Sequence, residues 1–166
     1  MSAVLTAMFE ERHEFFSSAL NGLANLSPGR HREVRLEELA RALGGHLRSV
    51  ELGTNAALRR VVPQLQVDEV MQRYSAVSAS LARLLADPAG GLPFANRLSE
   101  LGAAIEQMRI QEVFVVRKLS RHLGETALLM VELQMEDRFD EYVGAIGIHG
   151  VMSGAVVLAP SRRHAA

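Results

Sequence analysis

Apolar side chains recur at steps of three and four residues along most of this chain, which is the period of an amphipathic α-helix rather than a strand. Such stripes occupy residues 3–25, 33–62, 68–86, 94–122 and 125–142. The alternation typical of strands does not occur before residue 143. The pattern therefore predicts an all-α protein with five helices.

Short breaks separate these predicted helices. Residues 27–30 and 87–93 contain the proline and glycine that are typical of loops. Long helices with short connections favour an antiparallel, up-down four-helix bundle with a fifth, C-terminal helix. Gly44, Gly45 and Gly53 lie inside the second predicted helix, where each costs about 1 kcal/mol relative to alanine unless the helix bends or another backbone approaches closely.

The C-terminal part of the chain has a different pattern. Residues 1–143 form one predicted domain, whereas residues 144–166 are punctuated by glycine and carry an apolar run at 151–158. One interpretation is an arm that packs over the bundle and is partly disordered at its end. Another is a segment that covers a pocket or adds to a partner subunit as a strand.

Composition narrows the functional class. The chain has 166 residues, of which 48% are hydrophobic and 22% charged, and a formal net charge of -1. This profile is typical of one soluble domain and argues against binding of nucleic acid or of an anionic membrane surface. The absence of cysteine excludes disulfides, thiolate metal sites and a thiol nucleophile. With no signal-peptide pattern and no apolar run of the roughly 18 residues that a membrane span needs, we expect a cytoplasmic protein. Lys118 is the single lysine among 18 basic residues, a bias typical of GC-rich bacterial genomes.

Polar residues interrupt the apolar stripes near the middle of each helix. His13 lies between Phe9 and Phe16, and His46 and Tyr74 hold similar places on the second and third helices. The fourth helix carries Gln107, Gln111 and Glu112 near the same level. Because buried polar groups need partners, one such group from each of four helices predicts a connected interior site.

The order of helices and polar positions over residues 3–123 resembles the hemerythrin-like family, whose four-helix bundles hold an iron pair. In that family the helices carry, in order, a histidine, a His-x-x-x-Glu pair, a histidine and a second His-x-x-x-Glu pair. His13 and His46 match the first two histidines. Val50 stands at the first glutamate position and Tyr74 at the third-helix histidine, while Glu51 and Glu112 stand where the family's second glutamates stand.

The last ligand pair has two possible registers. One places Gln107 and Gln111 at the histidine and glutamate positions, and the other places Met108 and Glu112 there. On the first register the resemblance implies that the iron pair has been lost, because amides are weak ligands of iron and valine is none. We therefore expect no resident cofactor, with iron bound by His13, His46 and Glu112 as the alternative.

These residues suggest a polar interior pocket for a small molecule. In a metal-free acid–base enzyme, His13 or His46 would act as the general base or acid. Tyr74 would form a hydrogen bond with the substrate. The residues expected to bind substrate are Gln107, Gln111, Glu51, Glu112, Arg12, Arg48, Arg73 and Arg109. The four arginines would form a positive rim if the helices splay; otherwise they lay their stems on the core and point their charges into water.

Two other functions compete with this hypothesis. The first is a non-enzymatic interaction subunit that contacts a protein partner, or a second copy of itself, through the fifth helix and the apolar tail. The second is a metal sensor or an oxygen or redox protein that uses iron.

Overall fold

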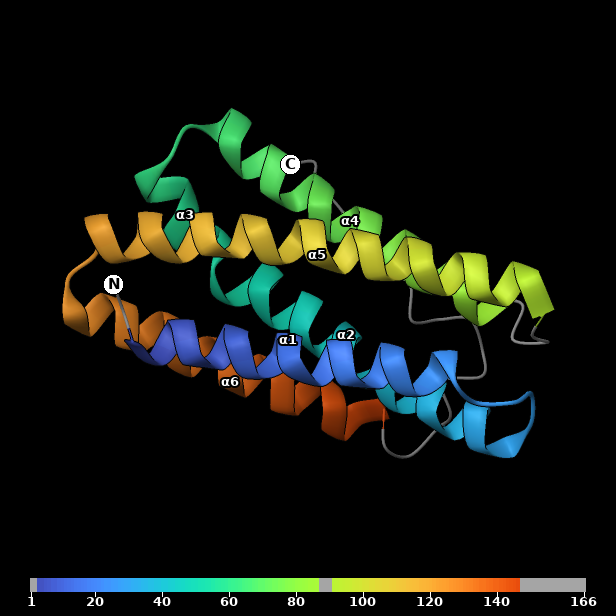
Figure 1. Ribbon diagram of the computed structural model, residues 1–166. Coiled ribbons are helices and arrows are strands. Elements are labelled where there is room, and N and C mark those ends of the chain that lie inside the picture. Colours follow the sequence, from blue (N-terminus) through green and yellow to red (C-terminus); the bar gives the residue numbers. More distant parts are fainter. Residues whose placement is uncertain (1–2, 87–90, 147–166) are drawn as a thin grey trace, which may run out of the picture.

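The computed structural model describes residues 3–86 and 91–146, and all secondary structure within these ranges is helical (Figure 1). The prediction of an all-α protein is therefore confirmed. The helices are α1 (Ala3–Ala24), α2 (Arg30–Gly53), α3 (Asn55–Val61), α4 (Gln64–Ala86), α5 (Gly91–His122) and α6 (Glu125–Ile146). None of the helices in these ranges has an apolar stretch long enough to cross a membrane.

The second predicted helix is in fact two helices, α2 and α3, which meet at Thr54. The Thr54 side chain donates a hydrogen bond of 2.7 Å to the Val50 carbonyl, and its backbone N–H donates to the same oxygen. Gly53, just before this junction, has little intrinsic preference for the helix. The prediction of one continuous helix was wrong here because the apolar stripe runs on in phase through Leu58, which is fully buried.

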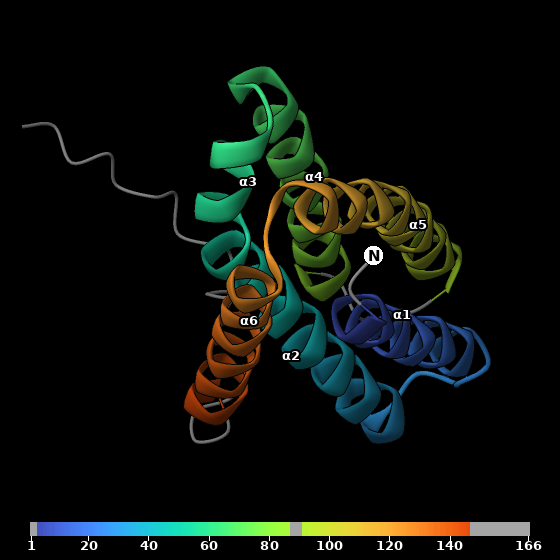
Figure 2. The same ribbon diagram turned by 90° about the vertical axis from the view of Figure 1, so that its left-hand side faces the viewer.

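The long helices lie alongside one another (Figure 1), and the end-on view shows α1, α2, α4 and α5 around a common interior (Figure 2). α4 packs along α5, and α1 contacts both α2 and α5. α6 packs most extensively on α2, on the side away from α1 (Figure 2). α6 continues to Ile146, so residues 144–146, predicted to begin the C-terminal arm, are helical, and the rest of that arm lies outside the described residues.

The interior is filled by the predicted apolar stripes. Its largest fully buried side chains are Leu5, Phe16, Leu23, Leu39, Leu43, Leu47, Leu58, Leu84, Leu101, Met108, Leu119 and Met135. Burying a side chain of this kind stabilises the fold by about 1.5–3 kcal/mol. The few polar side chains at the same depth therefore stand in a predominantly apolar environment.

The glycines of α2 make room for α6. A Cβ at Gly44 would lie 2.5 Å from the Tyr142 hydroxyl oxygen, and one at Gly53 would lie 2.5 Å from Cγ of Met135. Gly45 faces Phe139 in the same way. The close approach expected from these glycines is thus present: aromatic side chains come nearest at Gly44 and Gly45, whereas at Gly53 the Met135 backbone also approaches, to 3.2 Å.

Candidate functional site

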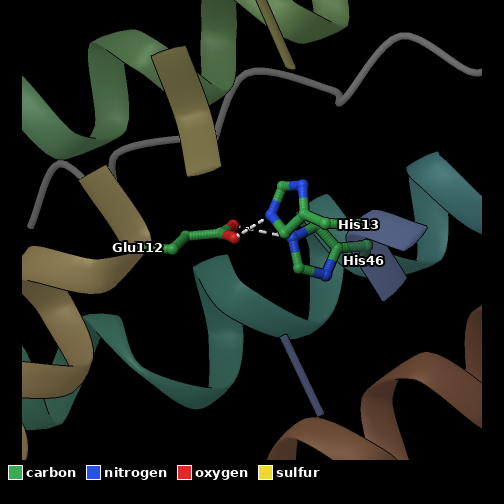
Figure 3. A group of neighbouring side chains, drawn as sticks. All are labelled: His13, His46 and Glu112. Carbon is green, nitrogen blue, oxygen red and sulfur yellow. Dashed lines mark hydrogen bonds and ion pairs between the residues drawn. The ribbon is translucent and has the colours of Figure 1, made fainter. Parts of the chain in front are cut away.

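Three buried side chains from three helices converge on one point in the interior (Figure 3). Nε2 of His13 on α1 lies 2.5 Å from Oε2 of Glu112 on α5, and Nε2 of His46 on α2 lies 2.7 Å from Oε1 of the same carboxylate. The exposed fractions of His13, His46 and Glu112 are 6%, 0% and 1%. We call these three residues the His–Glu centre.

Aromatic packing fixes the two imidazoles. The His46 ring meets Phe9 and Phe16 edge-on, with ring centroids 5.7 and 5.4 Å apart. Phe16 also packs against the His13 ring at 5.7 Å. Edge-to-face contacts at these separations are favourable, and they leave each imidazole little freedom to rotate. The helical spacing that places His13 between two phenylalanines therefore also orients it.

The carboxylate of Glu112 is the acceptor for both imidazoles. Burial by itself would raise the pKa of Glu112, but its interaction with His46 and the hydrogen bonds from both histidines outweigh this effect, so this pKa lies below its usual value. An ionised carboxylate only accepts hydrogen bonds, so each Nε2 donates. Burial lowers the pKa of His46, and this effect exceeds the opposite effect of Glu112. His46 is therefore neutral at pH 7.

Arg12 contacts the far side of the His46 ring. Its Nη1 lies 3.5 Å from Nδ1 of His46 and donates a hydrogen bond of 2.9 Å to Oγ of Ser49. Its Nη2 bonds Glu136 on α6 at 3.1 Å, and the guanidinium lies 4.3 Å from the Phe139 ring centroid. Because Arg12 can only donate, His46 Nδ1 faces it as an acceptor, which agrees with a proton on Nε2.

Tyr74 on α4 is the fourth polar side chain at this level. It is 3% exposed, and its hydroxyl has no hydrogen-bond partner among the described residues. Burial and the negative charge of Glu112 raise the pKa of Tyr74 well above its usual value. The hydroxyl thus remains protonated and lies close enough to Glu112 for the carboxylate to raise its pKa.

A cavity of about 150 Å³ adjoins the His–Glu centre. Two of the centre's residues, His13 and Glu112, form part of its wall. The remaining lining residues are Thr6, Phe9, Glu10, Arg109, Val113 and Val116. The centre therefore has one side from which a small molecule can reach it.

The structure brings together four of the polar residues that the sequence placed at a common level: His13, His46, Tyr74 and Glu112. Gln107 is exposed, so its expected interior position is wrong. The physical reason is helix phase, because one residue turns a side chain by about 100° around the axis. α5 points Met108 and Glu112 inward, which is the second of the two registers, and Gln111 is only half-buried.

The expected positive rim is not present as a group. Arg48 pairs with Glu51 at 3.0 Å on the surface of α2, so neither faces the centre. Arg73 is exposed. Arg109 lines the cavity but donates two hydrogen bonds to Glu106, at 2.6 and 2.8 Å. Among the described residues only Arg12, of the four arginines, contacts the His–Glu centre, because it alone lies on the inner edge of its stripe.

Sequence reasoning missed the partners of Arg12, which are Ser49, Glu136 and Phe139. Ser49 follows His46 by one helical turn, and that spacing was an available signal. The α6 residues gave no signal, because their role depends on how α6 docks on α2.

Comparison with protein-family models, with curated proteins and with solved structures finds no match to this chain. The chemistry of the site is thus the basis for assigning a function.

Proposed function

We propose that this chain binds one divalent transition-metal ion at the His–Glu centre, within a hemerythrin-like antiparallel four-helix bundle that has lost the ligands for an iron pair. One observation carries the proposal. Potential ligand atoms of His13, His46 and Glu112 all lie within 4.8 Å of one another in a buried position. Convergence of three such donors is uncommon without a shared partner, because it concentrates polar groups in an apolar interior.

The donor set suits a single ion better than a pair. Two imidazoles and one carboxylate are the ligands of many mononuclear Fe(II) and Zn(II) sites. An ion at this centre would replace the Nε2 protons that now bond Glu112, so its binding would release protons. The Tyr74 hydroxyl near Glu112 has no hydrogen-bond partner among the described residues, which is consistent with a bound group at this centre. An iron pair fits poorly, since Val50 and Met108 are fully buried where the family resemblance places ligands, and neither supplies an oxygen or nitrogen.

The protein's own contribution would be to hold the ion and to control access to it. An ion held by three protein ligands keeps a position for a small molecule and supplies Lewis-acid or redox chemistry there. Phe9 and Phe16 keep the imidazoles in place. The cavity beside His13 and Glu112 gives the small molecule its route.

Metal analysis tests this proposal. Protein purified without chelator, or refilled with Fe(II), Zn(II) or Mn(II), is expected to hold about one ion per chain after desalting. Glu112→Gln keeps the side-chain shape but removes the charge, and His46→Ala removes a ligand, so both are expected to hold at least about tenfold less. His122→Ala, at an exposed histidine of α5, is the matched control and should hold as much as the unmodified chain. Failure of the unmodified chain to retain any of the three ions overturns the proposal.

A second candidate is a metal-free acid–base site at the same residues. The position of Arg12 favours it, because a guanidinium 3.5 Å from His46 opposes a further positive charge and balances Glu112. In this function His13, oriented by Glu112 on the cavity wall, exchanges a proton with the bound molecule. Two results together support this candidate over the first. The unmodified chain would retain no metal after refilling, and His13→Gln would abolish the proton exchange that the unmodified chain shows with its bound molecule.

A further inference from the structure

The cavity beside the His–Glu centre has an outer and an inner end. It lies between α1 and α5, and its lining includes the exposed side chains of Glu10, Arg109 and Val113. At the other end, Phe9 and Val116 are 4% and 3% exposed. A molecule that enters from solvent therefore meets charged groups first and apolar walls next. The His–Glu centre lies at the buried end.

Size limits what can enter. The volume of about 150 Å³ equals that of an engineered apolar cavity in another protein that holds one benzene molecule. The walls contributed by Phe9, Val113 and Val116 are apolar, so they offer no replacement for the water that a highly hydrated ligand would lose. The cavity thus suits a single ring or a short chain.

Charge limits the polar end of that molecule. Glu112 forms part of the cavity wall with both oxygens acting as hydrogen-bond acceptors, and Glu10 adds a second carboxylate to the lining. Arg109, the cation of the lining, is already paired with Glu106 through two hydrogen bonds. A carboxylate ligand would lose its hydration and face Glu112 without a compensating cation. A neutral group with a hydrogen to donate can instead bond the Glu112 carboxylate.

We propose that the cavity binds a neutral molecule of about the size of phenol, with one hydroxyl that donates to Glu112 and an apolar body held by Phe9, Val113 and Val116. The inference deepens the proposed function, since it names the class of small molecule that approaches the His–Glu centre. The size and charge arguments use side chains that are in place with or without an ion. The inference can therefore stand if the metal proposal fails.

The experiment titrates phenol, toluene and benzoate into the full chain, as purified and after treatment with chelator. Binding is followed by calorimetry and by methyl NMR signals of Val113 and Val116. In the chelator-treated protein phenol should bind several-fold more tightly than toluene, which lacks the hydroxyl, and at least about tenfold more tightly than benzoate. Equal or tighter binding of benzoate in that protein overturns the inference.

Two matched variants locate the site. Val113→Phe fills the cavity from an exposed position, so it should fold normally and weaken phenol binding at least about tenfold. Ile110→Phe makes the same kind of enlargement at another exposed position of α5 that does not line the cavity, and it should leave binding unchanged. Val113→Leu is a smaller enlargement for use if the phenylalanine variant is unstable. Equal losses in the Val113 and Ile110 variants count against the site.

The outcomes also separate the two proposals. Phenol binding by a protein that retains no ion after refilling supports the cavity inference and overturns the metal proposal. Retained metal with no phenol binding does the reverse.

Discussion

Glu112 gives the centre of this protein its negative charge, and each of its oxygens accepts a hydrogen bond from a different histidine. Loss of this carboxylate would leave two buried N–H donors without an acceptor, a more costly state than the absence of all three groups. The same carboxylate adds to the rise that burial causes in the pKa of Tyr74. Glu112 is therefore the shared hydrogen-bond acceptor of both buried histidines.

The Tyr74 hydroxyl offers a test of this arrangement. Because the hydroxyl is buried and unpartnered, Tyr74→Phe should leave the free energy of unfolding of metal-free protein unchanged or raise it by about 1 kcal/mol. Urea unfolding in the presence of chelator measures the difference. A loss of more than about 1.5 kcal/mol would mean that the hydroxyl makes a stabilising hydrogen bond.

Residue patterns could reveal part of this centre. His13, His46 and Tyr74 interrupt regular apolar stripes, and that interruption was enough to place them inside. Glu112 lies beside the glutamines on α5, where the choice between Gln107 and Met108 as the inward residue depends on the rotation of a single helix. Neighbouring helices fix that rotation, so the sequence left both registers open.

At the scale of elements, the contact between α2 and α6 depends on glycine. An alanine Cβ at Gly53 would lie 2.5 Å from Met135 Cγ and 3.2 Å from its backbone nitrogen, and Met135 is fully buried. Gly53→Ala should therefore destabilise the fold by about 1–3 kcal/mol. Gly22→Ala is the matched control on α1, where nothing lies within 4 Å of the added Cβ.

The control is expected to have the opposite sign. Alanine at Gly22 should stabilise the protein by up to about 1 kcal/mol, because it favours the helix without meeting another group. Thermal unfolding of the two variants under identical conditions provides the comparison. Stabilisation by both would show that α6 does not require the glycine at position 53.

The sequence predicted helix positions better than helix contacts. Period and loop residues located α1, α4, α5 and α6 closely, because these depend on local patterning. The junction at Thr54 and the docking of α6 on α2 depend on contacts between distant residues. The glycines of α2 indicated that another segment packs closely against this helix, but the sequence did not predict that the segment is α6.

At the scale of the whole molecule, stability should fall as the pH falls below neutrality. The pKa of His46 is lowered from 6.5 in the folded chain. Below about pH 6.5 the unfolded chain therefore binds a proton at this residue more readily than the folded chain does, which destabilises the fold. The pKa of Glu112 is lowered from 4.5, so its contribution is complete above about pH 4.5 and is lost as the pH falls further. Both groups act in the same direction.

Unfolding of metal-free protein between pH 4 and pH 8 checks this expectation. A single buried histidine contributes a slope of at most about 1.4 kcal/mol per pH unit. His46→Gln should reduce the slope between pH 5 and pH 6.5, whereas His122→Gln, at an exposed position, should retain it. A flat profile in the unmodified protein would contradict the neutral state assigned to buried His46.

Composition limits the functional classes that fit the whole molecule but does not identify its partners. The absence of cysteine excludes thiol chemistry, and the candidate ligands that meet in the described part of the chain are imidazoles and a carboxylate. The predicted fifth helix is α6, which leaves three apolar side chains about half exposed: Leu129, Met130 and Leu133. The hypothesis that a protein partner binds there stays a prediction. The proposed role of the tail concerns residues outside the described ranges.

The glycine contacts also fix the position of α6 along α2. Met135 fits against Gly53 and Tyr142 against Gly44, two points about 13 Å apart along the axis of α2. A shift of α6 by one turn, about 5.4 Å, would move both side chains onto residues that have a Cβ. Glu136 and Phe139, the α6 residues that contact Arg12, lie between Met135 and Tyr142 in the sequence. The docking of α6 therefore fixes their positions as well. α6 thereby determines how close a positive charge stands to His46, although it supplies no ligand atom to the centre.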